Sequence, residues 1–135
     1  MISEYIVETT GPAVFVLDDE YEVLADLVCS SPRATPGIAL LWHELERARR
    51  VEGGKATSGR VTVGTRLAFT DLTKRESKVA TLVLPQDADG LNRIPVTSSV
   101  GAALLGLHAG EVLEWKTASG EVRSVRVDAV ERQAA

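Results

Sequence analysis

The sequence predicts an α+β protein in which a short N-terminal antiparallel helical hairpin precedes an antiparallel sheet packed on one short helix. In the first part of the 135-residue chain, apolar residues recur at helical spacing. From Arg60 onward they alternate or form short runs that are typical of strands. One short apolar segment, residues 100–105, lies between serine and glycine and predicts a small helix. We therefore divide the chain into a hairpin (residues 1–52), a linker (53–59) and a sheet domain (60–135).

The first predicted helix runs over residues 18–29. Asp18 or Asp19 is the expected N-cap, and Glu22 stands at the capping-box spacing from Asp19. The apolar residues follow a spacing of three and four: Tyr21, Leu24, Leu27 and Val28. The Ser-Ser-Pro sequence at 30–32 ends this helix.

The second predicted helix begins after Thr35, which is the expected N-cap, with Pro36 at the first helical position. We expect it to continue to about Arg50. One face is apolar: Ile38, Leu41, Leu45 and Ala48, with Trp42 beside it. Arg47, Arg49 and Arg50 would then lie in the last turn, before the glycines at 53–54.

The remaining elements are short. Strands are expected over 61–67, 79–84, 94–96, 111–117 and 122–130, with turns or loops over 71–73, 85–92 and 118–121. Ser98 or Ser99 is the expected cap of the small helix, and Gly106 ends it.

Composition excludes several functional classes. The formal net charge of -4 argues against a general nucleic-acid binder, which needs a basic face to displace counterions, and we expect no direct sequence-specific contact with nucleic acid. A single cysteine rules out a disulfide framework and fits a reducing cytoplasm. The apolar stretch 13–17 is too short to cross a bilayer, and Glu4 and Glu8 stand where a signal peptide needs positive charge. We expect a soluble cytoplasmic protein.

Residues that could carry catalysis or bind a metal are few. Cys29, His43 and His108 lie in three separate segments, without the close-spaced pair that zinc sites use. We therefore interpret the histidines as ordinary surface or half-buried residues and Cys29 as a small core residue. The sequence contains no phosphate-binding glycine loop. No catalytic, cofactor or metal site is predicted.

Four acidic residues of the hairpin lie together at its base. Asp18, Asp19, Glu20 and Glu22 start the first helix, whereas residues 30–37, which we call the tip, contain no acid. Glu44 and Glu46 are two positions apart and cannot share a helix face. Metal binding by the tip is therefore unsupported.

The most distinctive segment is the start of the small helix, Ser98-Ser99-Val100-Gly101-Ala102. A capped helix packed closely on a sheet explains the residues that follow it, up to Gly106. Val100 and Ala102 are expected to leave an uncharged, exposed apolar patch, and such patches often mark contact sites. These five residues are the candidate partner-binding site.

This segment also carries a family resemblance. Residues 100–107, with Gly110-Glu111 following, resemble the C-terminal domain of the Gre transcript-cleavage factors, and resemble more closely the regulator of nucleoside diphosphate kinase (Rnk) family. Further segments agree in the same order: 17–24, 44–48, 61–63 and 81–85. Together they cover nearly the whole chain.

The resemblance implies an FKBP-like sheet domain after a coiled-coil finger, and RNA polymerase as the partner. In the Gre family the globular domain docks at the rim of the secondary channel while the finger enters it. The family's Ser-Pro-aliphatic-Gly docking motif corresponds to Ser98, Ser99, Val100 and Gly101, with Ser99 in the place of the proline. Gre factors deliver acidic residues from the tip to the polymerase's magnesium. Because this tip has no acid, we expect a non-enzymatic regulator that occupies the channel entrance without transcript cleavage.

Two alternatives remain open. An FKBP-like fold permits a peptidyl-prolyl isomerase, but that activity needs an aromatic-lined pocket, and residues 60–135 offer only Phe69 and Trp115. The family name suggests regulation of nucleoside diphosphate kinase, which could act indirectly through transcription.

Overall fold

The computed structural model describes residues 8–31, 35–52, 58–117 and 119–131. The helices in these residues are α1 (Asp18–Ser30), α2 (Pro36–Arg47) and α4 (Ser99–Leu104), with a 3₁₀ turn, η2 (Pro85–Asp87). The strands are β1 (Glu8–Thr10), β2 (Phe15–Leu17), β3 (Arg49–Val51), β4 (Arg66–Asp71), β5 (Glu76–Val83), β6 (Arg93–Pro95), β7 (Val112–Lys116) and β8 (Val122–Val130).

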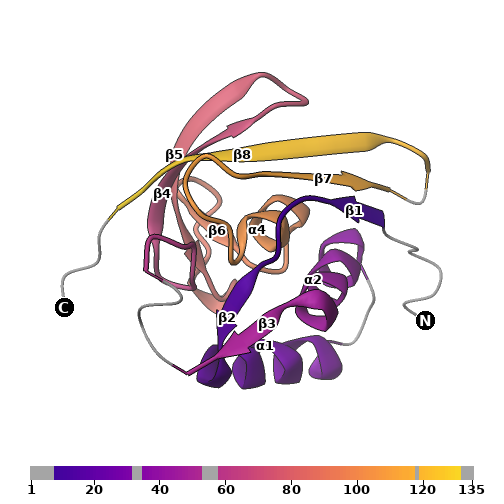
Figure 1. The fold of residues 1–135 in the computed structure, drawn as a ribbon, viewed down its shortest axis with the longest axis vertical. Coiled ribbons are helices and arrows are strands. Elements are labelled where there is room, and N and C mark those ends of the chain that lie inside the picture. The colour runs from indigo at the N-terminus through magenta and orange to yellow at the C-terminus, as the bar shows by residue number, and fades with distance from the viewer. Residues whose placement is uncertain (1–7, 32–34, 53–57, 118, 132–135) are drawn as a thin grey trace.

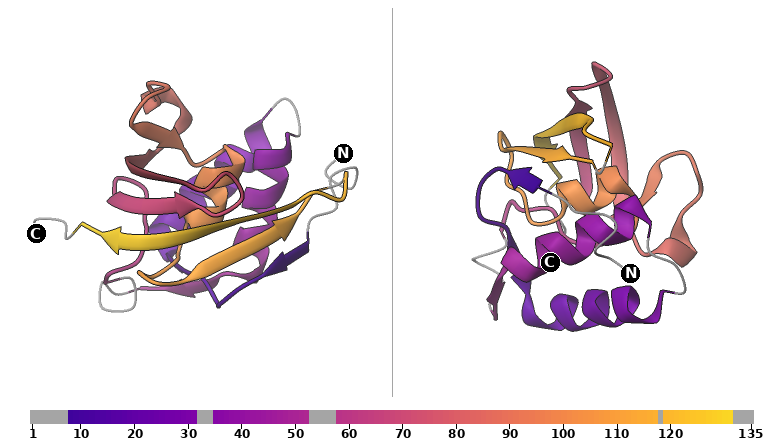
Figure 2. Two further views of the ribbon diagram at one scale, coloured as in Figure 1. Left: turned by 90° about the horizontal axis from the view of Figure 1, so that it is seen from above. Right: turned by 90° about the vertical axis from the view of Figure 1, so that its right-hand side faces the viewer.

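The six-stranded sheet has the strand order β1-β7-β8-β4-β5-β6, and the helices lie on one side of it (Figure 1). α4 lies next to the sheet, α2 packs on α4, and α1 packs on α2 as the outermost layer (Figure 2). β2 and β3 form a second, two-stranded sheet beside the helices. The predicted α+β class is confirmed.

The large sheet is mixed rather than antiparallel, which corrects the sequence-based expectation. Residues 81–83 of β5 pair in parallel with residues 93–95 of β6, whereas the other neighbouring strands are antiparallel. Residues 84–92 carry the chain back along the edge of the sheet, so that β6 runs in the direction of β5. The apolar pattern of a three-residue strand indicates which residues face the core, but it does not encode direction.

Pairing in the N-terminal half was not anticipated either. Arg49 and Arg50 lie in β3, which pairs in parallel with β2, and not in the last turn of the second helix. α2 ends at Arg47, and the backbone N–H of Arg49 donates to the carbonyl of Val14 at 2.9 Å. Strand pairing therefore outweighs the good helix propensity of the arginines.

α1 also begins differently from the expectation. Its N-cap is Leu17, which places Asp18 and Asp19 inside the first turn, where no capping box forms. Asp18 and Glu22 instead accept hydrogen bonds from Arg50, each at 2.7 Å. The carboxylates at the base of α1 thus hold this helix against β3.

α2 begins as predicted but is buried on more than one side. Thr35 Oγ1 accepts a hydrogen bond from the backbone N–H of Ile38 at 3.1 Å, and Pro36 is the first helical residue. Residues 37–41 are all buried, and five consecutive residues point to every side of a helix. α2 therefore lies enclosed between α1 and α4, whereas a projecting finger would leave most of it in solvent.

One hydrophobic core joins the helices to the sheet. It includes side chains from α1 and α2 together with side chains from α4 and the strands: Leu24, Val28, Leu41, Leu45, Phe69, Leu82, Leu104, Leu113, Trp115, Val125 and Val127. The expected linker at 53–59 lies largely outside the described residues. The division of the chain into residues 1–52 and 60–135 stays a prediction about sequence units.

A buried ion pair fastens α2 to the segment that leads into β2. Glu44 is 1% exposed, and both of its oxygens accept hydrogen bonds from Arg47, at 2.6 and 2.9 Å. Arg47 also donates to the carbonyl of Pro12 at 2.9 Å. Such two-point pairing is the geometry in which a buried carboxylate is best satisfied.

We predict that Glu44→Leu lowers the free energy of unfolding by about 3 kcal/mol, because Arg47 then remains partly buried without its counter-ion. The double variant Glu44→Leu/Arg47→Leu should be more stable than Glu44→Leu, since both charges are gone. Urea unfolding followed by circular dichroism measures both values. A double variant less stable than the single one would contradict this account.

Glu20 joins α1 to the start of the sheet region. Its Oε1 accepts a hydrogen bond from the backbone N–H of Val63 at 3.2 Å. Burial raises the pKa of this carboxyl group above its ordinary value, and the hydrogen bond from Val63 offsets part of that effect. The folded protein therefore binds the Glu20 proton more tightly than the unfolded chain does.

Because the pKa of Glu20 is higher in the folded than in the unfolded chain, ionising this carboxyl group disfavours folding. We predict that its contribution lowers the free energy of unfolding as pH rises from about 4, the ordinary pKa of glutamate, through the raised pKa of the folded state. Glu20→Gln should match the wild type at low pH and be more stable at pH 7, because an amide can accept the same bond without a buried charge. Urea midpoints at pH 4 and pH 7 test this. Glu46→Gln, at an exposed position of α2, is the control; an equal gain there would refute the role of Glu20.

Candidate partner-binding site

Hydrogen bonds from Ser98 shape the start of α4. Ser98 Oγ accepts from the backbone N–H of Gly101 at 3.0 Å and donates to the carbonyl of Pro95 at 2.8 Å. The backbone N–H of Ser98 donates to the same carbonyl at 3.0 Å. Ser98 is therefore the N-cap, and it ties α4 to the end of β6.

Two glycines let backbones approach closely around this cap. A Cβ on Gly37 of α2 would overlap the carbonyl oxygen of Thr97 and lie 2.8 Å from the carbonyl carbon of Ser98. A Cβ on Gly101 would overlap the carbonyl oxygen of Pro95. The first turn of α2 thus lies directly on the segment that starts α4. Gly37 was not predicted as a contact residue; its signal in the sequence is a glycine in the first helical turn, directly before the apolar run 38–42.

Only part of the candidate segment is open to a partner. Ser98, Ser99 and Val100 are half-buried, whereas Gly101 and Ala102 are buried. The expectation that Ala102 leaves an exposed apolar patch is therefore wrong, because the sheet and α2 cover that side of α4. The surface that α4 can present consists of Ser98, Ser99 and Val100.

The tip of the helical pair adjoins this surface through Gly37. Ser30 and Ser31 donate hydrogen bonds to the carbonyl of Leu27, at 3.3 and 2.7 Å, and close the end of α1. Residues 32–34, the middle of the tip, lie outside the described residues. The absence of acidic side chains from the tip is a property of the sequence itself.

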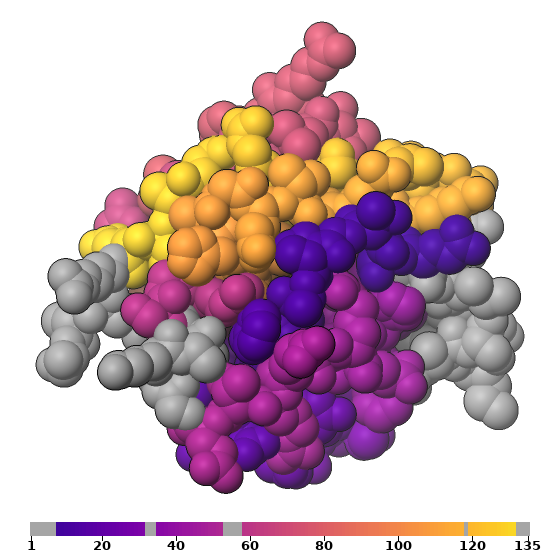
Figure 3. Space-filling view, in the orientation of Figure 1, coloured from indigo at the N-terminus to yellow at the C-terminus, as the bar shows by residue number. Residues whose placement is uncertain are grey.

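The residues considered for metal binding do not come together. Cys29 is exposed on α1, which corrects its interpretation as a core residue. His43 is half-buried on α2, where its Nε2 lies 3.1 Å from Thr9 Oγ1 of β1, and His108 is exposed in a turn. Figure 3 shows β1 lying across the junction between the sheet and α2. In the described part of the chain, no cluster of three or more His, Cys, Asp or Glu side chains is placed to hold a metal ion.

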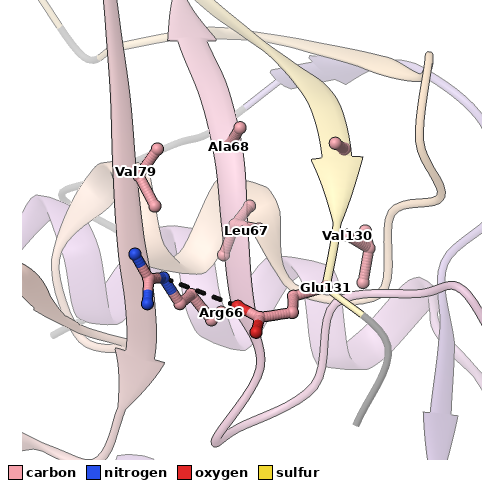
Figure 4. A pocket seen from close by; sticks show the side chains of 7 residues that line it. Arg66, Leu67, Ala68, Val79, Val130 and Glu131 are labelled. Carbon is pink, nitrogen blue, oxygen red and sulfur yellow. Dashed lines mark ion pairs between the residues drawn. The ribbon is translucent and has the colours of Figure 1, made fainter.

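A shallow hollow of about 390 Å³ lies over β4, β5 and β8 (Figure 4). It is lined by Arg66, Leu67, Ala68, Val79, Ala129, Val130 and Glu131, with an ion pair of 3.5 Å between Arg66 and Glu131. Phe69 and Trp115, which the isomerase alternative requires, are buried in the core at 2% and 3% exposure. The lining of this hollow contains no aromatic ring, so it lacks the aromatic wall that we expect around a bound proline.

Comparison with known proteins gives a consistent picture. Residues 56–132 match the family described as "Transcription elongation factor, GreA/GreB, C-term". The chain is 31% identical over 126 residues to the regulator of nucleoside diphosphate kinase of Escherichia coli K12, covering 90% of this chain and 91% of that protein. The chain belongs to the GreA/GreB transcription elongation factor family. The expected resemblance, including its Rnk branch, is confirmed.

Two further relatives support this membership. The GreA/GreB transcription elongation factor structure from Nitrosomonas europaea has a TM-score of 0.66 and 32% identity, covering 88% of this chain and 98% of that one. Transcription elongation factor GreA of Thermodesulfovibrio yellowstonii is 36% identical over 77 residues, or 56% of this chain and 49% of that protein. In this GreA/GreB-family chain, the described helices are all too short or too polar to span a membrane.

We predict that Gly37→Ala lowers the free energy of unfolding by about 1–3 kcal/mol, although alanine is the better helix former, because backbone atoms of Thr97 and Ser98 cannot give way. Gly90→Ala is the comparison: no atom lies within 4 Å of its Cβ, and only its positive φ of 75° costs stability. Thermal unfolding measures the stability of both variants, and native-state hydrogen exchange should show a loss of α4 protection for Gly37→Ala alone. Wild-type protection in that variant would contradict the contact.

Proposed function

We propose that this chain is a non-enzymatic, cytoplasmic transcription regulator that binds RNA polymerase at the rim of the secondary channel and does not stimulate transcript cleavage. Family membership supports the partner. Ser98, Ser99 and Val100 at the start of α4 would form the contact, with Gly101 and Ala102 buried beneath them as its support. We further propose that residues 60–135 form an FKBP-like unit, on which α1 and α2 pack as a short helical pair in the place of a projecting finger.

The position of the acidic residues carries the proposal that cleavage is absent. Transcript cleavage requires carboxylates that reach the polymerase's magnesium from the tip, and residues 30–37 contain none. Three of the five carboxylates of α1 are engaged at the opposite end: Asp18 and Glu22 with Arg50, and Glu20 with the N–H of Val63. These three groups join α1 to the rest of the fold and lie at the end of the helix away from the tip.

The length and packing of the helices agree with this proposal. The thirteen residues of α1 span about 20 Å at 1.5 Å per residue. α2 is enclosed between α1 and α4 and cannot extend away from the sheet without exposing its apolar side chains. A short, packed helical pair is suited to occupy a channel entrance and to compete with other factors there.

We predict that the chain co-purifies with RNA polymerase from its source organism and that a Gre factor competes with it. Backtracked transcription complexes incubated with the chain should show no more RNA cleavage than complexes alone, while a Gre factor in parallel cleaves. The absence of polymerase binding would overturn the proposed partner. Strong cleavage by the chain would overturn the argument from the tip.

Substitutions at Ser99 and Val100 test the proposed contact with RNA polymerase. Ser99 is the first residue of α4, a position that accepts proline because its N–H has no partner within the helix. We predict that Ser99→Pro folds normally and binds polymerase as tightly as the wild type or tighter, since it restores the family's docking motif. Val100→Glu should weaken binding at least tenfold, and Val122→Glu, on β8, is its control. Equal binding by all three variants would place the contact elsewhere.

The name of the Escherichia coli relative raises a second role, regulation of nucleoside diphosphate kinase. We propose that any such effect is indirect, through transcription of the kinase gene. Deleting the gene for this chain should then change kinase transcript and kinase activity in proportion. Direct binding of the purified chain to the kinase, with an unchanged transcript level, would contradict this.

A further inference from the structure

The loop between β5 and β6 displays a large apolar side chain in a polar setting. Leu91 is 84% exposed, far more than the other exposed large apolar residues, which reach 53%. Every residue from 86 to 93 is exposed, and apart from Ala88 and Gly90 the neighbours of Leu91 in this loop are polar or charged. Among the described residues, Leu91 is not one of the side chains that form or pack against the hydrophobic core.

This loop is held rigidly. Asp89 Oδ1 accepts hydrogen bonds from the backbone N–H groups of Leu91, Asn92 and Arg93, at 2.8, 3.1 and 3.0 Å. These bonds, led by that from Leu91, lower the pKa of Asp89, which keeps its carboxylate ionised. Gly90, at a φ of 75°, makes the turn, and η2 precedes it. A loop whose backbone is already fixed in place loses little backbone conformational entropy when one of its side chains binds a partner.

Backbone hydrogen bonds and β6 connect this loop to the start of α4. The carbonyl of Asn92 accepts from the N–H of Thr81 at 2.8 Å, which fastens the end of the loop to β5. β6 follows, and Ser98 bonds to the carbonyl of Pro95 at its end. Leu91 and the half-buried start of α4 are thus parts of one hydrogen-bonded segment, residues 89–100.

We propose that Leu91 is a second anchor for RNA polymerase, inserting into an apolar pocket on the polymerase next to the site that receives the start of α4. This inference rests on the proposed function and extends it to a second contact. An apolar side chain surrounded by polar residues matches the arrangement of protein–protein contacts, in which a dry centre is ringed by a polar rim. The exposed carboxylates of Asp87 and Asp89 favour basic residues around that pocket.

Binding of purified RNA polymerase core enzyme to labelled, full-length chain, measured by fluorescence anisotropy, tests the proposal. Leu91→Ser should bind at least tenfold more weakly with an unchanged melting temperature, since its side chain lies in solvent. Leu91→Met should bind within about twofold of the wild type. Val122→Ser, at a half-exposed valine of β8, is the matched control and should not change binding.

Asp89→Ala tests whether binding depends on how the loop positions Leu91, and not only on the presence of the leucine side chain. This variant keeps the leucine but removes three hydrogen bonds of the loop, so it should bind more weakly than the wild type while Leu91→Ser/Asp89→Ala binds no more weakly than Leu91→Ser. Additive losses would show that Asp89 contacts polymerase by itself and would overturn its role in fixing the leucine.

The outcomes distinguish this inference from the proposed function. If the wild-type chain does not bind polymerase, the proposed function fails, and the second anchor fails with it. If the wild type binds and Leu91→Ser binds equally well, the anchor alone is overturned. If sedimentation shows that the wild type self-associates and Leu91→Ser does not, with equal polymerase binding, the leucine contacts a second copy of the chain and the proposal is wrong.

Discussion

The contact between the first turn of α2 and the segment that starts α4 organises this protein. It requires glycine at position 37, because the carbonyl of Thr97 occupies the space of a side chain. It also requires Ser98 to hold the end of β6 against α4 through the carbonyl of Pro95. The helical pair, the small helix and the sheet edge consequently meet at one end of the molecule. A partner that recognises the start of α4 there also meets the tip of the helical pair.

The sequence predicted the N-caps of α2 and α4 but not that of α1, which is Leu17 and makes no side-chain cap bond. Thr35 and Ser98 cap their helices as expected, because each hydroxyl reaches a backbone N–H three residues away. Long-range pairing was not predictable in the same way. The direction of β6 depends on the path of residues 84–92, and Arg49 and Arg50 form a strand because β2 offers it a partner. Neither fact leaves a mark in the local apolar pattern.

The candidate site was likewise predictable where it depends on local sequence and not where it depends on long-range packing. Its location at the start of α4 followed from the sequence, since a serine cap before small residues is visible there. Its accessible part did not, because α2 and the sheet together bury Gly101 and Ala102, and that burial depends on two separate segments. Cys29 was misjudged for a related reason: it adjoins the apolar stripe of α1 but lies on the outer side of a helix whose inner side alone contacts α2. The sequence pattern of a helix indicates its apolar face, but the elements packed against the helix determine how much of its surface is buried.

Several carboxylates of this chain are bound by groups of the chain itself, and this bears on the proposed absence of transcript cleavage. The carboxylates that a cleavage factor would carry at its tip are found at the base, where Arg50 binds two of them and a backbone N–H binds a third. Glu44, buried against Arg47, is likewise committed to holding α2 in place. The carboxylates at the base of α1 lie at the opposite end of that helix from the tip. In this chain the carboxylates of Asp18, Glu20 and Glu22 fasten α1 to β3 and to the start of the sheet region, and the proposed absence of cleavage rests on that arrangement.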